Sequence, residues 1–73
     1  MKNSTLPSLP TLTRRQKQCL RLLVKGCTAA EISLRLYISI RMVRDHLRQA
    51  KVKLGCDSIL QAAVKASRAG LLD

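Results

Sequence analysis

The stretch that decides the fold is residues 28–54, TAAEISLRLYISIRMVRDHLRQAKVKL. It opens with Thr28, and Glu31 follows three residues later, which is the spacing of a capping box at the start of a helix. Ser39 is a second N-cap candidate, so a short helix and a longer one are predicted with only residues 37–38 between them. Two helices joined by so short a turn must cross steeply, which is the helix-turn-helix arrangement.

Both helices show an apolar stripe at helical spacing, and nothing in the chain alternates with period two. Inward-facing positions are predicted at Ile32 and Leu36 in the shorter helix and at Val43, Leu47, Ala50 and Leu54 in the longer one. The longer helix is predicted to span about 15 residues, or about 22 Å at 1.5 Å per residue.

Two further helices flank this pair. Thr13 and Ser58 are N-cap candidates, and each is followed three residues later by a Gln that completes a capping box. Gly26 and Gly70 can adopt positive φ and are predicted to end these helices. The sequence therefore predicts an all-α, tetrahelical fold of four short helices with tight links.

The length of 73 residues allows one domain at most. Residues 1–12 are rich in Ser, Thr and Pro and are predicted to form a flexible N-terminal arm, in which Lys2 is the only basic residue. Residues 13–73 are the predicted helix-turn-helix domain. No apolar run approaches the roughly 18 residues of a membrane span, and the first residues do not resemble a secretion signal.

The charge of the chain points to a polyanionic partner. Lysine and arginine number 14 against four acidic residues, a formal net charge of +10, and a small folded domain with this imbalance repels itself. Nucleic acid and an anionic membrane surface are the usual partners. Tyr37 is the only aromatic residue, which argues against base-stacking folds and against membrane anchoring. Double-stranded DNA is therefore the predicted partner, with no membrane.

The longer helix carries five of the 14 basic residues. Its basic residues recur at a spacing of three or four and share one face, away from the apolar stripe. They are Arg41, Arg44, Arg48 and Lys51, with Lys53 near the end of the helix. Asp45 is the only acid among them. A solvated face is the ordinary interpretation of a charged run, but it does not explain why nearly all the charges have one sign, so we predict DNA contact.

The sequence contains no catalytic or metal-binding constellation. Cys19, Cys27 and Cys56 form no CxxC pair, and His46 is the only histidine, whereas a zinc site needs close Cys pairs together with His. Cys19 and Cys27 are predicted to fill apolar positions on one helix, as free thiols in a reducing cytosol. We therefore predict no enzyme activity, no metal and no cofactor.

A longer motif runs through all four predicted helices. It consists of Leu12-Thr13-x-Arg15-Gln16, Leu22-Leu23-Val24-x-Gly26-x-Thr28-x-x-Glu31-Ile32, Leu36-x-Ile38-Ser39-x-x-x-Val43-x-x-His46, Lys53-Leu54-Gly55, and Gln61-Ala62 through Ala69-Gly70-Leu71-Leu72. In residue types and spacing this motif resembles the LuxR/GerE-type DNA-binding domain. The resemblance implies a bacterial, cytoplasmic, nucleoid-associated transcription regulator. It also implies that the third helix enters the major groove and that the fourth helix forms a homodimer on two-fold symmetric sites.

The resemblance also implies roles for single residues. The base-reading positions correspond to Arg44, Asp45 and Arg48, and the backbone-contacting positions to Thr28, Arg41, His46, Lys51 and Lys53. Simpler interpretations stay open for three of them. In these interpretations, Thr28 does no more than cap its helix, and His46 packs under the third helix and bonds a carbonyl. Asp45 does no more than pair with Arg41 or Arg48 along its own helix.

The fourth helix is the expected dimer contact, because its alanines would let two helices approach closely. These are Ala62, Ala63 and Ala66, with Val64 at the edge. The same alanines could instead fill the core of the monomer, and spacing alone does not separate the two roles. Ala63 is the residue predicted to face outward.

Two positions depart together from the pattern that the resemblance implies. Gln16 stands where the family usually has Glu, and Ile59 stands where it usually has Arg. In the family those two charges face each other across the first and fourth helices. Because both are replaced, neither charge is left unpaired in a half-buried place.

Family members usually carry a second, signal-sensing domain, so this chain is expected to be either a standalone regulator of the GerE kind or an excised domain. An alternative function belongs to another class. A truncated family member could act as an interaction protein that heterodimerises with a full-length relative through its fourth helix and modulates it. The basic third helix argues against a pure decoy, which needs no charge for reading the groove.

Overall fold

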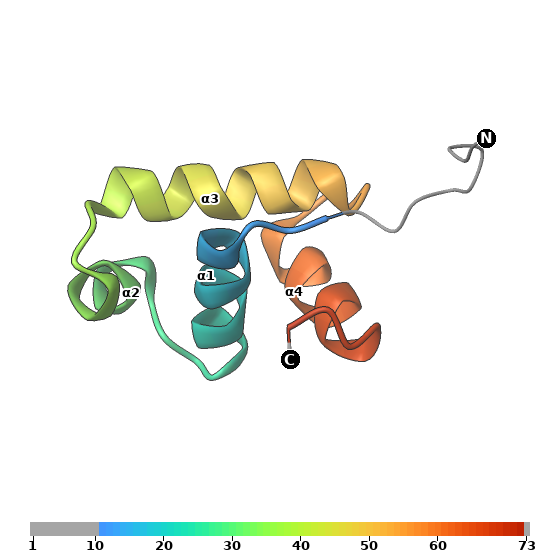
Figure 1. Ribbon diagram of the computed structural model, residues 1–73, viewed down its shortest axis with the longest axis horizontal. Coiled ribbons are helices and arrows are strands. Elements are labelled where there is room, and N and C mark those ends of the chain that lie inside the picture. The colour runs from blue at the N-terminus through green and yellow to red at the C-terminus, as the bar shows by residue number, and fades with distance from the viewer. Residues whose placement is uncertain (1–10, 73) are drawn as a thin grey trace.

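The computed structural model describes residues 11–72, which form four helices and no strand (Figure 1). They are α1 (Arg14–Val24), α2 (Ala29–Leu36), α3 (Ile40–Lys53) and α4 (Ile59–Arg68). The predicted all-α, four-helix fold is confirmed. No helix within the described residues is long and apolar enough to cross a bilayer.

All four helices begin at the predicted N-caps. In each, a Thr or Ser hydroxyl accepts a hydrogen bond from the backbone N–H three residues later, and the capping boxes at Thr13 and Thr28 are complete. The box at Ser58 is only half formed, because the Gln61 side chain accepts from the backbone N–H of Asp57, at 3.2 Å, instead of from Ser58. The cap conformation also differs, since Ser58 has φ −136°, whereas Thr13 has φ −70°.

Two left-handed residues direct the chain out of α1 and α2. Gly26 has φ +98°, and after it the N–H of Cys27 bonds the carbonyl of Leu22 at 3.0 Å. Cys27 therefore lies beyond the end of α1, so the prediction that it shares a helix with Cys19 is wrong, although both side chains are buried. Tyr37 ends α2 with φ +58° and is the one non-glycine residue with positive φ in the described chain.

A single core lies between the helices, with α1 packed against α2, α3 and α4. Its fully buried large side chains are Leu20, Ile32, Val43 and Cys19. Leu12 is also buried, so the packed domain begins before Thr13, within the stretch predicted as a flexible arm. Thr11 is described as well, and residues 1–10 of that predicted arm, with Lys2, lie outside the described residues.

The alanines of α4 face the core. Ala62 and Ala66 are fully buried, and Ala63 is 1% exposed, so the prediction that Ala63 faces outward is wrong. The physical reason is that α4 packs against both α1 and α3, and two neighbours cover a sector wide enough to bury adjacent residues. The small side chains bring α4 close to these helices inside one protomer.

Candidate nucleic-acid interface

The helix-turn-helix consists of α2, the turn at residues 37–38, and α3. The N–H of Ile38 bonds the carbonyl of Ser33 at 3.2 Å, which closes the end of α2 before the chain enters α3 at its Ser39 cap. Val43, Leu47 and Ala50 turn one face of α3 into the core. α3 lies along one edge of the molecule (Figure 1), so its opposite face is open.

That open face is basic. Arg41, Arg44 and Arg48 are exposed, and together with Ile40 and Asp45 they line a shallow surface hollow. The structure thus brings the three predicted base-reading residues to one place with one of the predicted backbone-contacting residues. A convex helix with arginines on its outer face can enter the major groove, which is about 12 Å wide.

The acid of this face is paired with an arginine of the same helix. Asp45 Oδ1 lies 3.3 Å from Arg48 Nη1, one helical turn away, and this is the only ion pair within residues 11–72. Of the two partners considered for Asp45, the structure selects Arg48. Both side chains are well exposed, so the pair adds little to stability. Its consequence is a preferred direction for the Arg48 guanidinium.

Thr28 caps α2, and both its backbone N–H and its side chain hydrogen-bond the Glu31 carboxylate. Its Oγ1 accepts from the N–H of Glu31 at 3.1 Å, while its own N–H donates to Glu31 Oε1 at 2.8 Å. Hydrogen bonds from the Thr28 backbone N–H and from the Thr28 side chain lower the pKa of the exposed Glu31 carboxyl. A hydroxyl has a single donor proton, so a phosphate oxygen at Thr28 would compete with the Glu31 carboxylate for it.

The remaining predicted backbone-contacting residues differ in their exposure and in how many of their hydrogen-bond donors are already used. Lys53 is exposed, but its Nζ donates to the Thr11 carbonyl at 2.9 Å and to Gln16 Oε1 at 3.0 Å. One of the three N–H donors of its ammonium group is therefore left for a phosphate. Lys51 and His46 are half-buried. Within residues 11–72 the His46 ring makes no hydrogen bond, so the carbonyl bond considered for it is not formed there.

Sequence reasoning missed the side-chain network behind Lys53. Gln16 is only 2% exposed, and it was predicted as a capping residue alone. Its Nε2 donates to Gln49 Oε1 of α3 at 3.1 Å, and its Oε1 also accepts from the Thr13 N–H at 3.0 Å. The two glutamines are 33 residues apart in sequence, and no local pattern signals that contact. Ile59 is partly buried and packs against the core.

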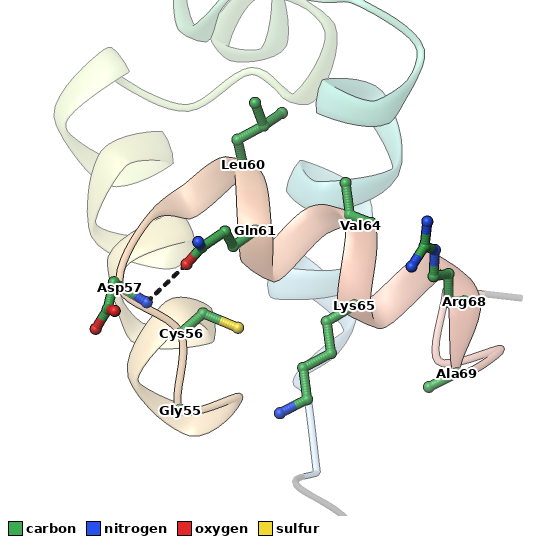
Figure 2. A pocket seen from close by; sticks show the side chains of 9 residues that line it. All are labelled: Gly55, Cys56, Asp57, Leu60, Gln61, Val64, Lys65, Arg68 and Ala69. Atoms are coloured by element: carbon green, nitrogen blue, oxygen red, sulfur yellow. Dashed lines mark hydrogen bonds between the residues drawn. The ribbon is translucent and has the colours of Figure 1, made fainter.

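The exposed apolar surface on α4 was predicted only in part, since Val64 was placed at the edge of the dimer contact and Leu60 was not named. Leu60 is 70% exposed and Val64 is 43% exposed, one turn apart. With Leu23 and Val24 of α1 they line one groove, and on the other side they border a hollow that also holds Cys56 and Lys65. Figure 2 shows Leu60 and Val64 projecting from the same side of α4. Their i, i+4 spacing was the available signal.

In the part of the chain that the structure describes, the cysteines and acidic residues form no cluster. Burial raises the pKa of the Cys19 thiol, and nearby Arg15 only partly opposes this, so Cys19 is a poor nucleophile. All three cysteines are free. Within residues 11–72 no three His, Cys, Asp or Glu side chains come together in a way that could hold a metal ion.

Comparison with known proteins gives two consistent findings. The sequence profile described as "Bacterial regulatory proteins, luxR family" matches residues 10–66. The chain is 40% identical over 73 residues to the spore germination protein GerE of Bacillus subtilis (strain 168), covering 100% of this chain and 99% of that protein. It is also 38% identical over 61 residues to the transcriptional activator protein AnoR of Acinetobacter nosocomialis, where it spans 84% of this chain but 26% of AnoR.

Proposed function

Because this chain belongs to the luxR family of bacterial regulatory proteins, a family of DNA-binding transcription regulators, we propose that it binds specific double-stranded sites with α3 in the major groove. The observation that carries this proposal is the open face of α3. It holds three exposed arginines around a single acid, directly opposite the buried stripe.

Sequence would be read by the middle of that face. A guanidinium can donate two parallel hydrogen bonds to guanine O6 and N7, and this suits Arg44 and Arg48. Asp45 has one carboxylate oxygen on Arg48 and the other free. The free oxygen can accept from cytosine N4, while the paired one holds Arg48 toward the groove.

The surrounding groups would fix register on the duplex without reading it. Arg41 flanks the base-reading residues, and the Thr28 hydroxyl lies at the start of α2, the helix that crosses the backbone in helix-turn-helix proteins. Lys51, Lys53 and His46 would complete the phosphate contacts along α3. Counterion release from these contacts supplies affinity that does not depend on sequence.

The dimer of the proposal uses α4, through its exposed residues and not through the alanines. Leu60 and Val64 are large apolar side chains that solvent reaches, with Val24 of α1 next to them. A two-fold contact places the same patch of both subunits face to face, and such a patch buries these groups from water. The homodimer would carry two α3 helices for two half-sites.

The same patch would also accept α4 of a longer relative, which is the second function we carry forward. A heterodimer of this kind would modulate the relative's DNA binding. The exposed arginines of α3 favour the direct regulator, because a protein that acts only by masking a partner needs no basic groove-reading face. In either role the proposed location is the bacterial cytoplasm, at the nucleoid, where the DNA is.

Selection of bound duplexes from a randomised pool tests the proposal, with wild type, Arg44→Ala and Arg44→Lys compared. Wild type should return a preferred sequence with two-fold symmetry. Arg44→Lys keeps the charge but loses the two-pronged donor, so it should relax one position at similar affinity, whereas Arg44→Ala should also weaken binding overall. No enrichment by wild type, or tighter binding to single strands, contradicts the proposal.

A further inference from the structure

The outer face of α1 carries a second basic stripe that the proposed function does not use. Arg14, Lys17, Arg21 and Lys25 follow one another at spacings of three, four and four. They lie on one side of the helix, opposite the buried Gln16, Cys19 and Leu20. With Arg15 this makes five basic residues and no acid between residues 14 and 25.

Like charges lie close together along this stripe, and its N-terminal end is unfavourable for the isolated domain. Arg14 and Arg15 occupy the first turn of α1, which contains no acidic residue, and cations there oppose the helix macrodipole, whereas Arg21 and Lys25 lie at the other end, where the macrodipole favours them. Lys17 with Arg21 and Arg21 with Lys25 are like charges at i, i+4, which also destabilise a helix. Within residues 11–72 no carboxylate pairs with any of them. An external polyanion would offset this repulsion.

The direction of the stripe separates it from the groove-reading face. Figure 1 shows α1 with its first turn next to α3 and its last turn at the far edge of the molecule. From Arg14 to Lys25 the stripe runs eleven residues, or about 16 Å along the helix axis. A straight duplex lying along the outer face of α3 would therefore meet the stripe only at its Arg14 end, and the Lys25 end points away from it.

The local surface suits phosphates better than a protein. Arg14, Lys17, Gln18 and Arg21 line a shallow hollow. The Arg21 guanidinium is held in place there, because its Nε donates to the Leu72 carbonyl at 2.9 Å and its Nη2 donates to the same oxygen. The hollow has no exposed aromatic or aliphatic anchor of the kind that centres protein interfaces. Basic side chains without such an anchor are typical of phosphate-backbone binding.

We propose that α1 carries a second DNA-binding surface, Arg14, Lys17, Arg21 and Lys25, which takes the phosphate backbone of another duplex without reading its sequence. One protein would then hold two DNA segments, one at α3 and one at α1. This goes beyond the site-specific binding proposed above, because it predicts bridging in addition to recognition.

The test is a bridging assay with two 20-base-pair duplexes. The first is immobilised and saturated with protein, and capture of a second, fluorescent duplex is measured against salt. Wild type should capture it with a log–log salt slope of about −3, for three to four neutralised phosphates. The triple variant Arg14→Gln/Lys17→Gln/Lys25→Gln should lose at least tenfold in capture while binding the first duplex within about threefold of wild type. Arg21 is left in place because it holds Leu72.

A charge-conserving triple variant, Arg14→Lys/Lys17→Arg/Lys25→Arg, is the matched control and should still bridge, because phosphate neutralisation requires charge and not a particular side chain. Arg44→Ala, by contrast, should lower site preference on the first duplex and leave the α1 surface intact, so the two proposals fail separately.

Four results would overturn the second surface. The first is that wild type captures no second duplex. The second is that capture survives the glutamine triple variant, which would place bridging on two α3 helices, and the third is that this variant loses the first duplex equally, which would place the stripe on the same DNA. The fourth is that poly-glutamate binds the stripe more tightly than duplex DNA does, which would make the partner an acidic protein.

Discussion

Gln16 and Gln49 join the start of α1 to the middle of α3 by one hydrogen bond, Nε2 to Oε1 at 3.1 Å. Gln16 also accepts from the Thr13 N–H and from Lys53 Nζ, so a nearly buried amide has a partner for each oxygen lone pair and for one of its two N–H donors. The network positions α3 relative to α1, and within it Lys53 connects α3 to the segment before α1 by donating to the Thr11 carbonyl. The groove-reading helix is thus held at its C-terminal half by polar contacts as well as by the core.

Replacing Gln16 with Leu should destabilise the domain by about 1–3 kcal/mol, because the Thr13 N–H and the Lys53 ammonium lose an acceptor in a partly buried place. Urea unfolding followed by circular dichroism measures this. Gln18→Leu is the control, since Gln18 bonds only the exposed Arg15 side chain at 3.2 Å, and it should change stability by less than about 0.5 kcal/mol. Equal effects of the two variants would mean that the network adds no stability.

Asp45→Ala should relax the sequence preference at one base position, by about 1–3 kcal/mol if the free carboxylate oxygen reads cytosine N4. The measurement is a selection from randomised duplexes with wild type and the variant side by side. Asp45→Asn, which keeps the shape but removes the charge, is a useful companion. If all three proteins return the same preferred sequence, Asp45 only directs Arg48 through the 3.3 Å pair.

Leu60→Glu should weaken the dimer and operator binding while leaving helix content unchanged, because Leu60 is exposed and a charge there is desolvated only when two subunits meet. Ala63→Glu should instead unfold the domain, because Ala63 is 1% exposed and a carboxylate has no room or partner in the core. Analytical ultracentrifugation and circular dichroism distinguish the two results. A Leu60→Glu protein that sediments as a dimer would exclude the Leu60–Val64 surface as the contact.

Tyr37→Gly should stabilise the protein by about 0.5–1 kcal/mol. Tyr37 is in the left-handed region with φ +58° and its side chain is 93% exposed, so glycine relieves the strain of Cβ without losing packing. Tyr37→Ala keeps the Cβ and should give no comparable gain. The midpoint of urea unfolding reports the difference, and a glycine variant no more stable than the alanine variant would show that the tyrosine conformation is unstrained.

The helix starts, the turn and the basic face could all be predicted from the sequence because they depend on near neighbours. A cap such as Thr28 acts on a backbone N–H three residues away, and residues such as Arg44 and Arg48 share a face because of helical geometry alone. Those contacts exist whatever the rest of the chain does.

What only the tertiary structure decided involves residues far apart in the chain. Ala62 and Ala63 are adjacent and chemically identical, and both are buried because α1 and α3 cover α4 from two sides. Leu12 also joins the core, although its own sequence neighbourhood is typical of a flexible arm. Gln16 finds Gln49 across 33 residues. Helical periodicity determines which residues share a face, but the burial of that face depends on how the helices pack.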